Sequence, residues 1–239
     1  MKIWAHRGCS LRYPENTLLA FEKAANLDGL EGIELDVQMS KDGGLVIIHD
    51  EQLDRTTDGT GFVKDYTLSE LKKFHIKTIN NELSETIPTL NEVMELLQKK
   101  RVKLNIELKN SKVMYHGMEE KVINVINKYG FEDRVVYSSF YAKSLEQIRK
   151  LLPKAEIGIL DTKASDCIYK MNGKCGANAI HPYAGAIDLD RKDLEDINVR
   201  AWLTEDLYPE KQTGKVIEIR KLEEAGITDV FLNEPEMYL

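Results

Sequence analysis

The sequence predicts an α/β fold, a TIM (β/α)8 barrel with an antiparallel hairpin return strand and a small insertion over the barrel mouth. Short apolar segments recur along the whole chain, and most are separated by helical patterns. Strands that alternate with helices imply βα units around a parallel sheet. At 239 residues the chain suits one such barrel, which is often a single domain. We therefore expect one domain over residues 1–239, with the insertion at about 51–88.

The apolar segments predict nine strands, one more than the barrel needs. They lie at 2–6, 32–37, 45–49, 102–108, 134–139, 156–160, 178–182, 199–203 and 229–233.

The surplus strand is the third, because only residues 38–44 separate it from the second. A parallel crossover needs about a dozen residues or more. Asp42-Gly43 is typical of the centre of a hairpin turn, so the third strand should return antiparallel. A turn centred there pairs position 49 with position 36 and predicts that His49 lies beside Asp36.

Helices are predicted between the strands. Apolar residues at 18, 19, 24 and 25 mark the first, and Thr89 opens another as a capping box with Glu92. Further helices are expected at about 143–151 and at 212–225, the last ending at Gly226. The stretch 51–88 has no barrel-strand pattern, although 67–70 could begin a short helix. Such a long loop in a compact domain is usually functional.

Carboxylates alternate with apolar residues along two of the predicted strands. Glu34 and Asp36 share one face of the second strand, and Glu107 and Lys109 share one face of the strand at 102–108. In a barrel the outer face meets helices, so these side chains should point into the lumen near the strand C-termini, where barrel enzymes place their active sites. Three converging carboxylates repel one another unless a cation or protons relieve the repulsion. An all-oxygen set suits one divalent cation, Mg²⁺ or Ca²⁺, rather than zinc.

Two histidines end strands that flank this carboxylate strand, His6 and His49. An imidazole can take a proton from a nucleophile or give one to a leaving alkoxide, so both are candidate acid/base residues. Arg7 offers a forked donor to phosphate oxygens, and Lys109 a compact positive charge. Gly8 either leaves room for the substrate or serves the turn.

Other residues at strand ends are weaker candidates for contact with the substrate. They are Trp202, Phe140 and His181, with Asn233 and Glu234 as further residues that could reach the mouth.

Composition excludes several classes of function. The net charge of −7 disfavours a nucleic-acid binder, which needs a basic footprint. Three cysteines without a CxxC motif favour a reducing compartment, and no apolar run approaches the roughly 18 residues of a membrane span. We therefore expect a cytoplasmic protein. Walker A, GxSxG and HExxH motifs are absent, which disfavours P-loop, α/β-hydrolase and zincin chemistry.

Taken in order, the motifs closely resemble the glycerophosphodiester phosphodiesterase family. They are Ala5–Gly8 (AHRG), Pro14–Thr17 (PENT), Ile33–Val37 (IELDV), Lys41–Gly43 (KDG), Val46–Asp50 (VIIHD), Leu53–Thr57 (LDRTT) with Gly59 and Gly61, Ile87–Leu90 (IPTL) and Ile106–Lys109 (IELK). The likeness is weaker in the C-terminal half, where Phe231–Pro235 (FLNEP) stands in place of the Ile-Thr-Asp that the family often has before a nearby proline.

The resemblance implies a TIM barrel with an insertion after the second histidine. It also implies metal ligands at Glu34, Asp36 and Glu107, acid/base histidines at His6 and His49, and phosphate contacts at Arg7 and Lys109. The implied reaction is hydrolysis of small glycerophosphodiesters, such as glycerophosphocholine or glycerophosphoethanolamine, to glycerol 3-phosphate and an alcohol.

Several alternatives stay open at this point. His49 is favoured as the base and His6 as the acid, but the roles could be reversed, and either water or the glycerol 2-hydroxyl could attack phosphorus. A related barrel that cleaves lipid phosphodiesters, as a lysophospholipase D or a phospholipase C does, is the nearest rival. The insertion has few apolar residues, which favours a small diester. A non-enzymatic alternative is a catalytically silent module that only binds phosphodiesters. Loss of a candidate histidine or metal ligand would indicate it, and none is missing from the sequence.

Overall fold

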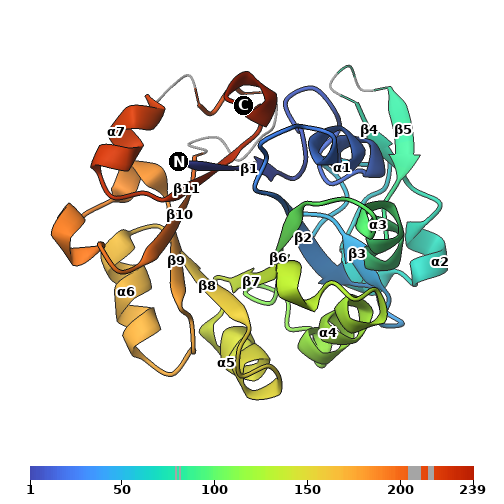
Figure 1. Ribbon diagram of the computed structural model, residues 1–239. Helices are drawn as coiled ribbons and strands as arrows, with labels where there is room; N and C mark the ends of the chain where they lie inside the picture. The colour runs from blue at the N-terminus through green and yellow to red at the C-terminus, as the bar shows by residue number, and fades with distance from the viewer. Residues whose placement is uncertain (79, 81, 204–210, 215–217) are drawn as a thin grey trace.

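A computed structural model describes residues 1–78, 80, 82–203, 211–214 and 218–239, and its strands form a closed parallel barrel (Figure 1). The eight barrel strands, in their order around the barrel, are β1 (Lys2–His6), β2 (Gly32–Met39), β6 (Lys103–Leu108), β7 (Val135–Ser139), β8 (Glu156–Asp161), β9 (Ala179–Pro182), β10 (Asn198–Trp202) and β11 (Asp229–Leu232). β1 pairs in parallel with both β2 and β11, which closes the barrel.

Helices surround the strands, as Figure 1 shows. They are α1 (Leu18–Ala25), α3 (Leu90–Leu97), α4 (Met118–Lys128), α5 (Ala142–Leu151), α6 (Ala164–Asn172) and α7 (Ile219–Glu224). Alternate strand residues such as Leu35 and Ile106 share one hydrophobic core with the apolar sides of these helices. The intervening strand residues face the lumen, as the period of two requires. Among the described residues, the structure has no helix long and apolar enough to cross a membrane.

The predicted strands are all present, and most helix predictions are confirmed. Thr89 caps α3 in a capping box, in which the Thr89 N–H donates to Glu92 Oε2 at 2.7 Å. The helix predicted at 212–225 is wrong at its start, since α7 begins at Ile219 and residues 215–217 lie outside the described part. Residues 213 and 214 are instead bonded to the Glu234 carboxylate, a contact that holds them against the barrel.

The return strand β3 (Leu45–Ile47) is antiparallel to β2, but its predicted register is wrong by one residue. Val37 pairs with Ile47, and the Ile48 N–H donates to the Asp36 carbonyl at 3.1 Å, so position 36 lies opposite 48 rather than 49. The loop has three residues instead of two, with Gly43 in the left-handed region at φ +85°. His49 therefore follows the end of the ladder instead of lying within it.

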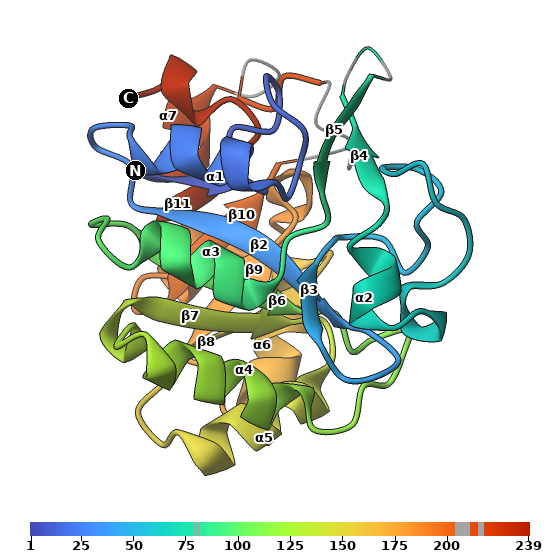
Figure 2. The same ribbon diagram turned by 90° about the vertical axis from the view of Figure 1, so that its right-hand side faces the viewer.

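The insertion forms a small layer beyond the C-terminal end of β2 (Figure 2). It contains the 3-10 helix η1 (Val63–Asp65), α2 (Leu68–Leu71) and a hairpin of β4 (His75–Lys77) and β5 (Leu83–Thr86) that the sequence pattern did not predict. A hydrophobic cluster of its own joins the insertion to β3 through Val46, Leu53, Leu71 and Ile87.

The remaining 3-10 helices lie outside the insertion. They are η2 (Glu132–Arg134), η3 (Ala184–Ala186), η4 (Arg191–Asp193) and η5 (Pro235–Met237).

Gly8 serves the turn from β1 into α1. Its φ is +85°, and a Cβ at this position would lie 2.7 Å from the Cβ and carbonyl carbon of Ala20. Both the backbone conformation and the close approach to α1 therefore require glycine.

We expect Gly8→Ala to lower the free energy of unfolding by about 2–5 kcal/mol, because a left-handed penalty adds to an overpacked contact. Gly130 is a matched control, since its φ is +63° and a Cβ there would meet nothing within 4 Å. Gly130→Ala should cost only about 1–2 kcal/mol. Urea unfolding of both variants measures the difference, and equal losses would contradict the packing argument.

Candidate active site

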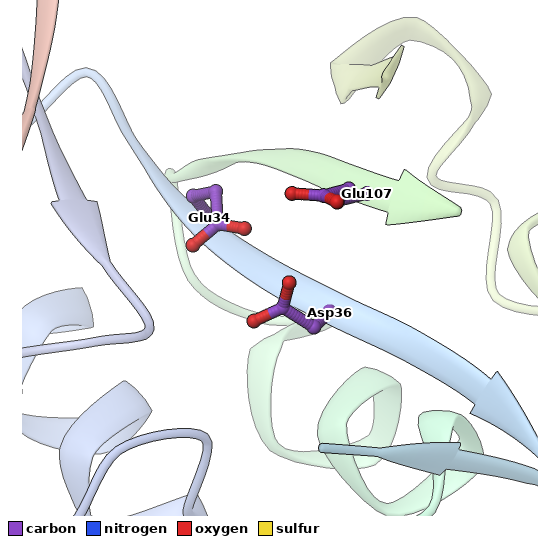
Figure 3. Close-up of side chains that lie close together, drawn as sticks. All are labelled: Glu34, Asp36 and Glu107. Carbon is purple, nitrogen blue, oxygen red and sulfur yellow. The ribbon is translucent and has the colours of Figure 1, made fainter. Parts of the chain in front are cut away.

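Three carboxylates meet on two adjacent strands of the barrel. Glu34 and Asp36 come from β2 and Glu107 from β6, where Asp36 is the register partner of Glu107. One ligand oxygen from each lies within 4.8 Å of the other two, and Figure 3 shows the carboxylates turned toward one another. The alternation of the two strands places them on one lumen-facing side. The arrangement matches an oxygen-ligated divalent cation.

Burial and mutual repulsion shape the charges of this triad. Burial, and then the Asp36 carboxylate, raise the pKa of Glu34 well above its usual value. Burial also opposes ionisation of Asp36, but His49, Lys109 and Arg7 lower its pKa. Lys109 Nζ lies 2.9 Å from Glu107 Oε1 and 3.6 Å from Asp36 Oδ1. The buried Asp36 Oδ1 accepts no hydrogen bond from the described residues, so it can serve as a ligand.

Arg7 reaches the triad from a strained turn. Its φ is +58°, which is uncommon for any residue but glycine, and its N–H donates to Glu34 Oε2 at 3.0 Å. Its Nε lies 3.4 Å from Asp36 Oδ2. Asn16 is the other non-glycine residue with positive φ among those described, and it donates to the same Asp36 oxygen at 2.9 Å. Both described non-glycine residues with left-handed backbone therefore lie beside the carboxylates.

His6 is held by the end of the last strand. Its Nδ1 lies 2.7 Å from Asn233 Oδ1, and Asn233 Nδ2 donates to the Lys211 carbonyl, so the amide oxygen faces the imidazole. Nδ1 therefore carries the proton, and Nε2 is left for chemistry. Burial, and then the charge of Arg7, lower the pKa of His6 to about 3. Sequence reasoning placed Asn233 only near the mouth, and this contact across the barrel closure gives it a definite role.

His49 is held through both its side chain and its backbone. Its Nδ1 lies 2.6 Å from Asp50 Oδ1, again leaving Nε2 available. Gln38 Nε2 donates to the carbonyls of residues 48, 49 and 50 at 3.2, 3.0 and 2.6 Å, and Tyr115 Oη donates to Gln38 Oε1 at 2.9 Å. Gln38 was missed from the sequence, although it continues the polar alternation of Glu34 and Asp36.

These groups open into one pocket with a polar and an apolar wall. Its lining consists of His6, Arg7, Glu34, His49, Asn105, Glu107, Phe140, Leu160, His181, Trp202 and Phe231. The polar side comes from β1, β2, β6 and His49. The apolar side comes from the later strands and the residue after β7, which is Phe140.

The weaker candidates for substrate contact, Trp202, His181 and Phe140, all lie in the apolar wall. Trp202 packs against Tyr183 with ring centroids 4.8 Å apart. His181 is fully buried, 5.6 Å from the Phe231 ring, and its ring nitrogens have no hydrogen-bond partner among the described residues. Gly158 leaves the space that the His181 ring fills, because a Cβ there would lie 2.1 Å from Nε2.

Comparison with known proteins identifies the family. Residues 6–237 match the glycerophosphoryl diester phosphodiesterase family. A glycerophosphodiester phosphodiesterase from Caldanaerobacter subterraneus subsp. tengcongensis is 49% identical over 183 residues, covering 76% of this chain and 75% of the relative. One from Bacillus subtilis is 33% identical over 252 residues, covering 98% of this chain and 84% of the relative.

A solved structure shares the fold over nearly the whole chain. The Oleispira antarctica phosphodiesterase, in complex with the product sn-glycerol-3-phosphate, aligns with a TM-score of 0.81 and 28% identity over 99% of this chain and 94% of that one. The solved structure and the barrel described above therefore share one fold over nearly the whole chain. The chain belongs to the glycerophosphoryl diester phosphodiesterase family.

Proposed function

We propose that this enzyme hydrolyses small glycerophosphodiesters, such as glycerophosphocholine and glycerophosphoethanolamine, to glycerol 3-phosphate and an alcohol. The observation that carries the proposal is the acidic triad set between two histidines, each with Nδ1 held and Nε2 available. The family match and the relatives named glycerophosphodiester phosphodiesterase support the same reaction. In this proposal the barrel and the insertion act as one domain.

Glu34, Asp36 and Glu107 would hold one divalent cation, Mg²⁺ or Ca²⁺, and their all-oxygen donor set fits either ion. When bound, the ion supplies Lewis-acid polarisation of the phosphate and neutralises charge as phosphorus is attacked. Arg7 and Lys109, already within 3.6 Å of the triad oxygens, bind the remaining phosphate charge. Both side chains are almost wholly buried, which strengthens their attraction for an anion.

His49 acts as the base that takes a proton from the attacking hydroxyl. His6 acts as the acid: its ring is neutral without substrate because its pKa is about 3, so its Nε2 must take up a proton when the anionic phosphodiester binds beside it and then pass that proton to the departing alcohol. The Asp50 carboxylate on Nδ1 of His49 stabilises the positive charge that the ring acquires when Nε2 takes a proton. The Asn233 amide fixes the His6 ring without adding a charge to it. The two partners therefore favour this assignment of roles over the reverse.

The apolar wall receives the uncharged part of the substrate. Trp202 and Phe140 pack against its carbon chain, and His181 contacts it from the pocket side of its ring. The three cysteines, Cys9, Cys167 and Cys175, are free and buried, which supports the proposal of a reducing, cytoplasmic compartment.

A small diester is favoured over a lipid. Apolar residues of the insertion pack inside its own cluster, and among the described residues of the insertion Phe62 is the one large hydrophobic side chain that is exposed, at 39%. A lysophospholipase D or phospholipase C-like activity is the second candidate, and turnover on lysophosphatidylcholine compared with glycerophosphocholine separates the two.

The direct test is release of glycerol 3-phosphate from glycerophosphoethanolamine by the purified protein, with Mg²⁺ or Ca²⁺ and then with excess EDTA. We expect metal-dependent release that the chelator abolishes. Absence of release with either ion, in protein shown to be folded by circular dichroism, would overturn the proposed substrate class.

We expect His6→Ala and His49→Ala each to lower kcat by at least about 100-fold, because a positioned acid or base contributes roughly 10²–10⁴. Steady-state kinetics on the same substrate measure the loss. His116→Ala is the control, since His116 lines a different pocket, together with Tyr115 and Glu120. A folded His6 or His49 variant with full activity would remove that residue from the mechanism.

Glu107→Gln should weaken cation binding, because it replaces a charged oxygen ligand with a neutral amide of the same shape. Isothermal titration of Mg²⁺ or Ca²⁺ into the wild-type and variant proteins measures the change without requiring turnover. Glu119→Gln offers a comparison outside the triad, since Glu119 is buried but bonded to Asn110. Equal affinity of wild type and Glu107→Gln would exclude Glu107 as a ligand.

A further inference from the structure

Arg55 lies in the insertion and forms two forked ion pairs at once. Nε and Nη2 donate to the Asp50 carboxylate at 2.7 and 3.1 Å. Nη1 and Nη2 donate to the Glu15 carboxylate at 2.6 and 2.8 Å. Paired N–H bonds to a carboxylate are the strongest and most directional that arginine makes.

Each of the two carboxylates also contacts a residue of the proposed reaction. Asp50 Oδ1 lies 2.6 Å from His49 Nδ1, and Glu15 Oε1 accepts from Arg7 Nη1 at 2.8 Å. An unbroken chain of contacts therefore runs from the imidazole through Arg55 to the phosphate-binding guanidinium. These residues come from two segments, the turn after β1 and the start of the insertion.

We propose that Arg55 is a positioning residue that holds Asp50 against His49 and Glu15 against Arg7, and so makes the insertion a part of the catalytic machinery. The proposal rests on His49 and Arg7 acting as the proposed function assigns them. It goes beyond that function by giving the insertion a role in aligning both the base and the phosphate contact.

The two carboxylates depend on Arg55 in different ways. Only 4% of the Glu15 side chain is exposed, so Glu15 cannot turn to water in place of a lost partner, whereas 29% of the Asp50 side chain is exposed, so Asp50 needs Arg55 to hold its orientation. Burial alone would raise the pKa of Glu15, but Arg7 and Arg55 lower it. Without Arg55, Glu15 would retain Arg7 alone, and Asp50 would be free to rotate away from the imidazole.

A purely structural role for Arg55, as an anchor of the insertion, predicts different behaviour. The insertion has a second anchor in Lys72, whose Nζ donates to the Ile87 carbonyl and to Glu92 at 3.0 Å. Lys72→Ala is therefore the matched control, since it cuts an anchor of the insertion without touching the pocket. The hydrophobic cluster of the insertion remains in both variants.

The first experiment reads the His49 imidazole directly. Long-range ¹H–¹⁵N spectra of ¹⁵N-histidine-labelled protein at alkaline pH report which ring nitrogen carries the proton, and His49→Gln assigns the signals. We expect the Nδ1–H form in the wild type and in Lys72→Ala, and loss of this preference in Arg55→Ala. An unchanged His49 spectrum in folded Arg55→Ala would overturn the proposal.

The second experiment measures kinetics and phosphate binding. Arg55→Ala should lower kcat by about 10- to 100-fold, as a misplacement of about 1 Å can cost 10²-fold. The kcat of Arg55→Lys should lie between those of the wild type and Arg55→Ala, since lysine keeps the positive charge but cannot form the paired N–H bonds. Combining Arg55→Ala with Asp50→Asn should lower kcat by less than the product of the two single losses, because the Asp50 arm is already cut and only the Glu15 arm remains, whereas fully multiplied losses would contradict action through Asp50.

Inorganic phosphate titrated calorimetrically should bind several-fold more weakly to Arg55→Ala and to Glu15→Gln than to wild type or Lys72→Ala. Equal affinity in all four proteins would refute the arm of the proposal that reaches Arg7. If the wild type hydrolyses no glycerophosphodiester, the proposed function fails by itself. The imidazole spectra and the phosphate titration would then still decide whether Arg55 positions these groups.

Discussion

The structure depends above all on keeping charged side chains together in a closed barrel lumen. Glu34, Asp36 and Glu107 are drawn to within ligand distance of one another, where their repulsion opposes folding. Lys109 and Arg7 offset part of that repulsion, but Arg7 is shared with a further carboxylate outside the triad. Three negative charges thus face less than two full positive ones, and the remainder is relieved either by a proton or by a cation. Burial, and then repulsion by Asp36, raise the pKa of Glu34, and the same excess of negative charge attracts a divalent ion.

The left-handed backbone of Arg7 and Asn16 is explained by the contacts that these residues make with the carboxylates of β2. Arg7 follows β1 directly at a left-handed φ of +58°, and its backbone N–H donates to the Glu34 carboxylate of β2. Gly8 then allows the backbone to pass against Ala20, so helix and turn pack at contact distance. Strain of this kind persists only where surrounding contacts hold it in place, and the hydrogen bonds of Arg7 and Asn16 to the β2 carboxylates do so.

Much of this arrangement follows from the sequence, and what does not follow has identifiable causes. Strand alternation and barrel closure together are enough to predict that Glu34, Asp36 and Glu107 share the lumen. Alternation puts the carboxylates on one face of each strand, and closure makes that face the inside of the barrel. The hairpin register depended on a three-residue loop instead of a two-residue one, which the Asp42-Gly43 pair does not distinguish. The β4–β5 hairpin is too short and polar to show an apolar alternation. The contact of Asn233 with His6 joins residues 227 positions apart, and no local pattern encodes it.

The two histidines illustrate how one fold can give like residues unlike tasks. Both leave Nε2 available because Nδ1 is engaged, but the neutral amide of Asn233, just after the last strand, engages His6, and the carboxylate of the next residue, Asp50, engages His49. The Asp50 carboxylate is charged and the Asn233 amide is neutral, so the two rings have unlike partners at Nδ1. Unlike surroundings for two like side chains are what separate acid and base roles in a shared site. The difference arises from topology, since β11 closes the barrel beside β1 while the insertion follows β3, and the site therefore needs both ends of the fold to be complete.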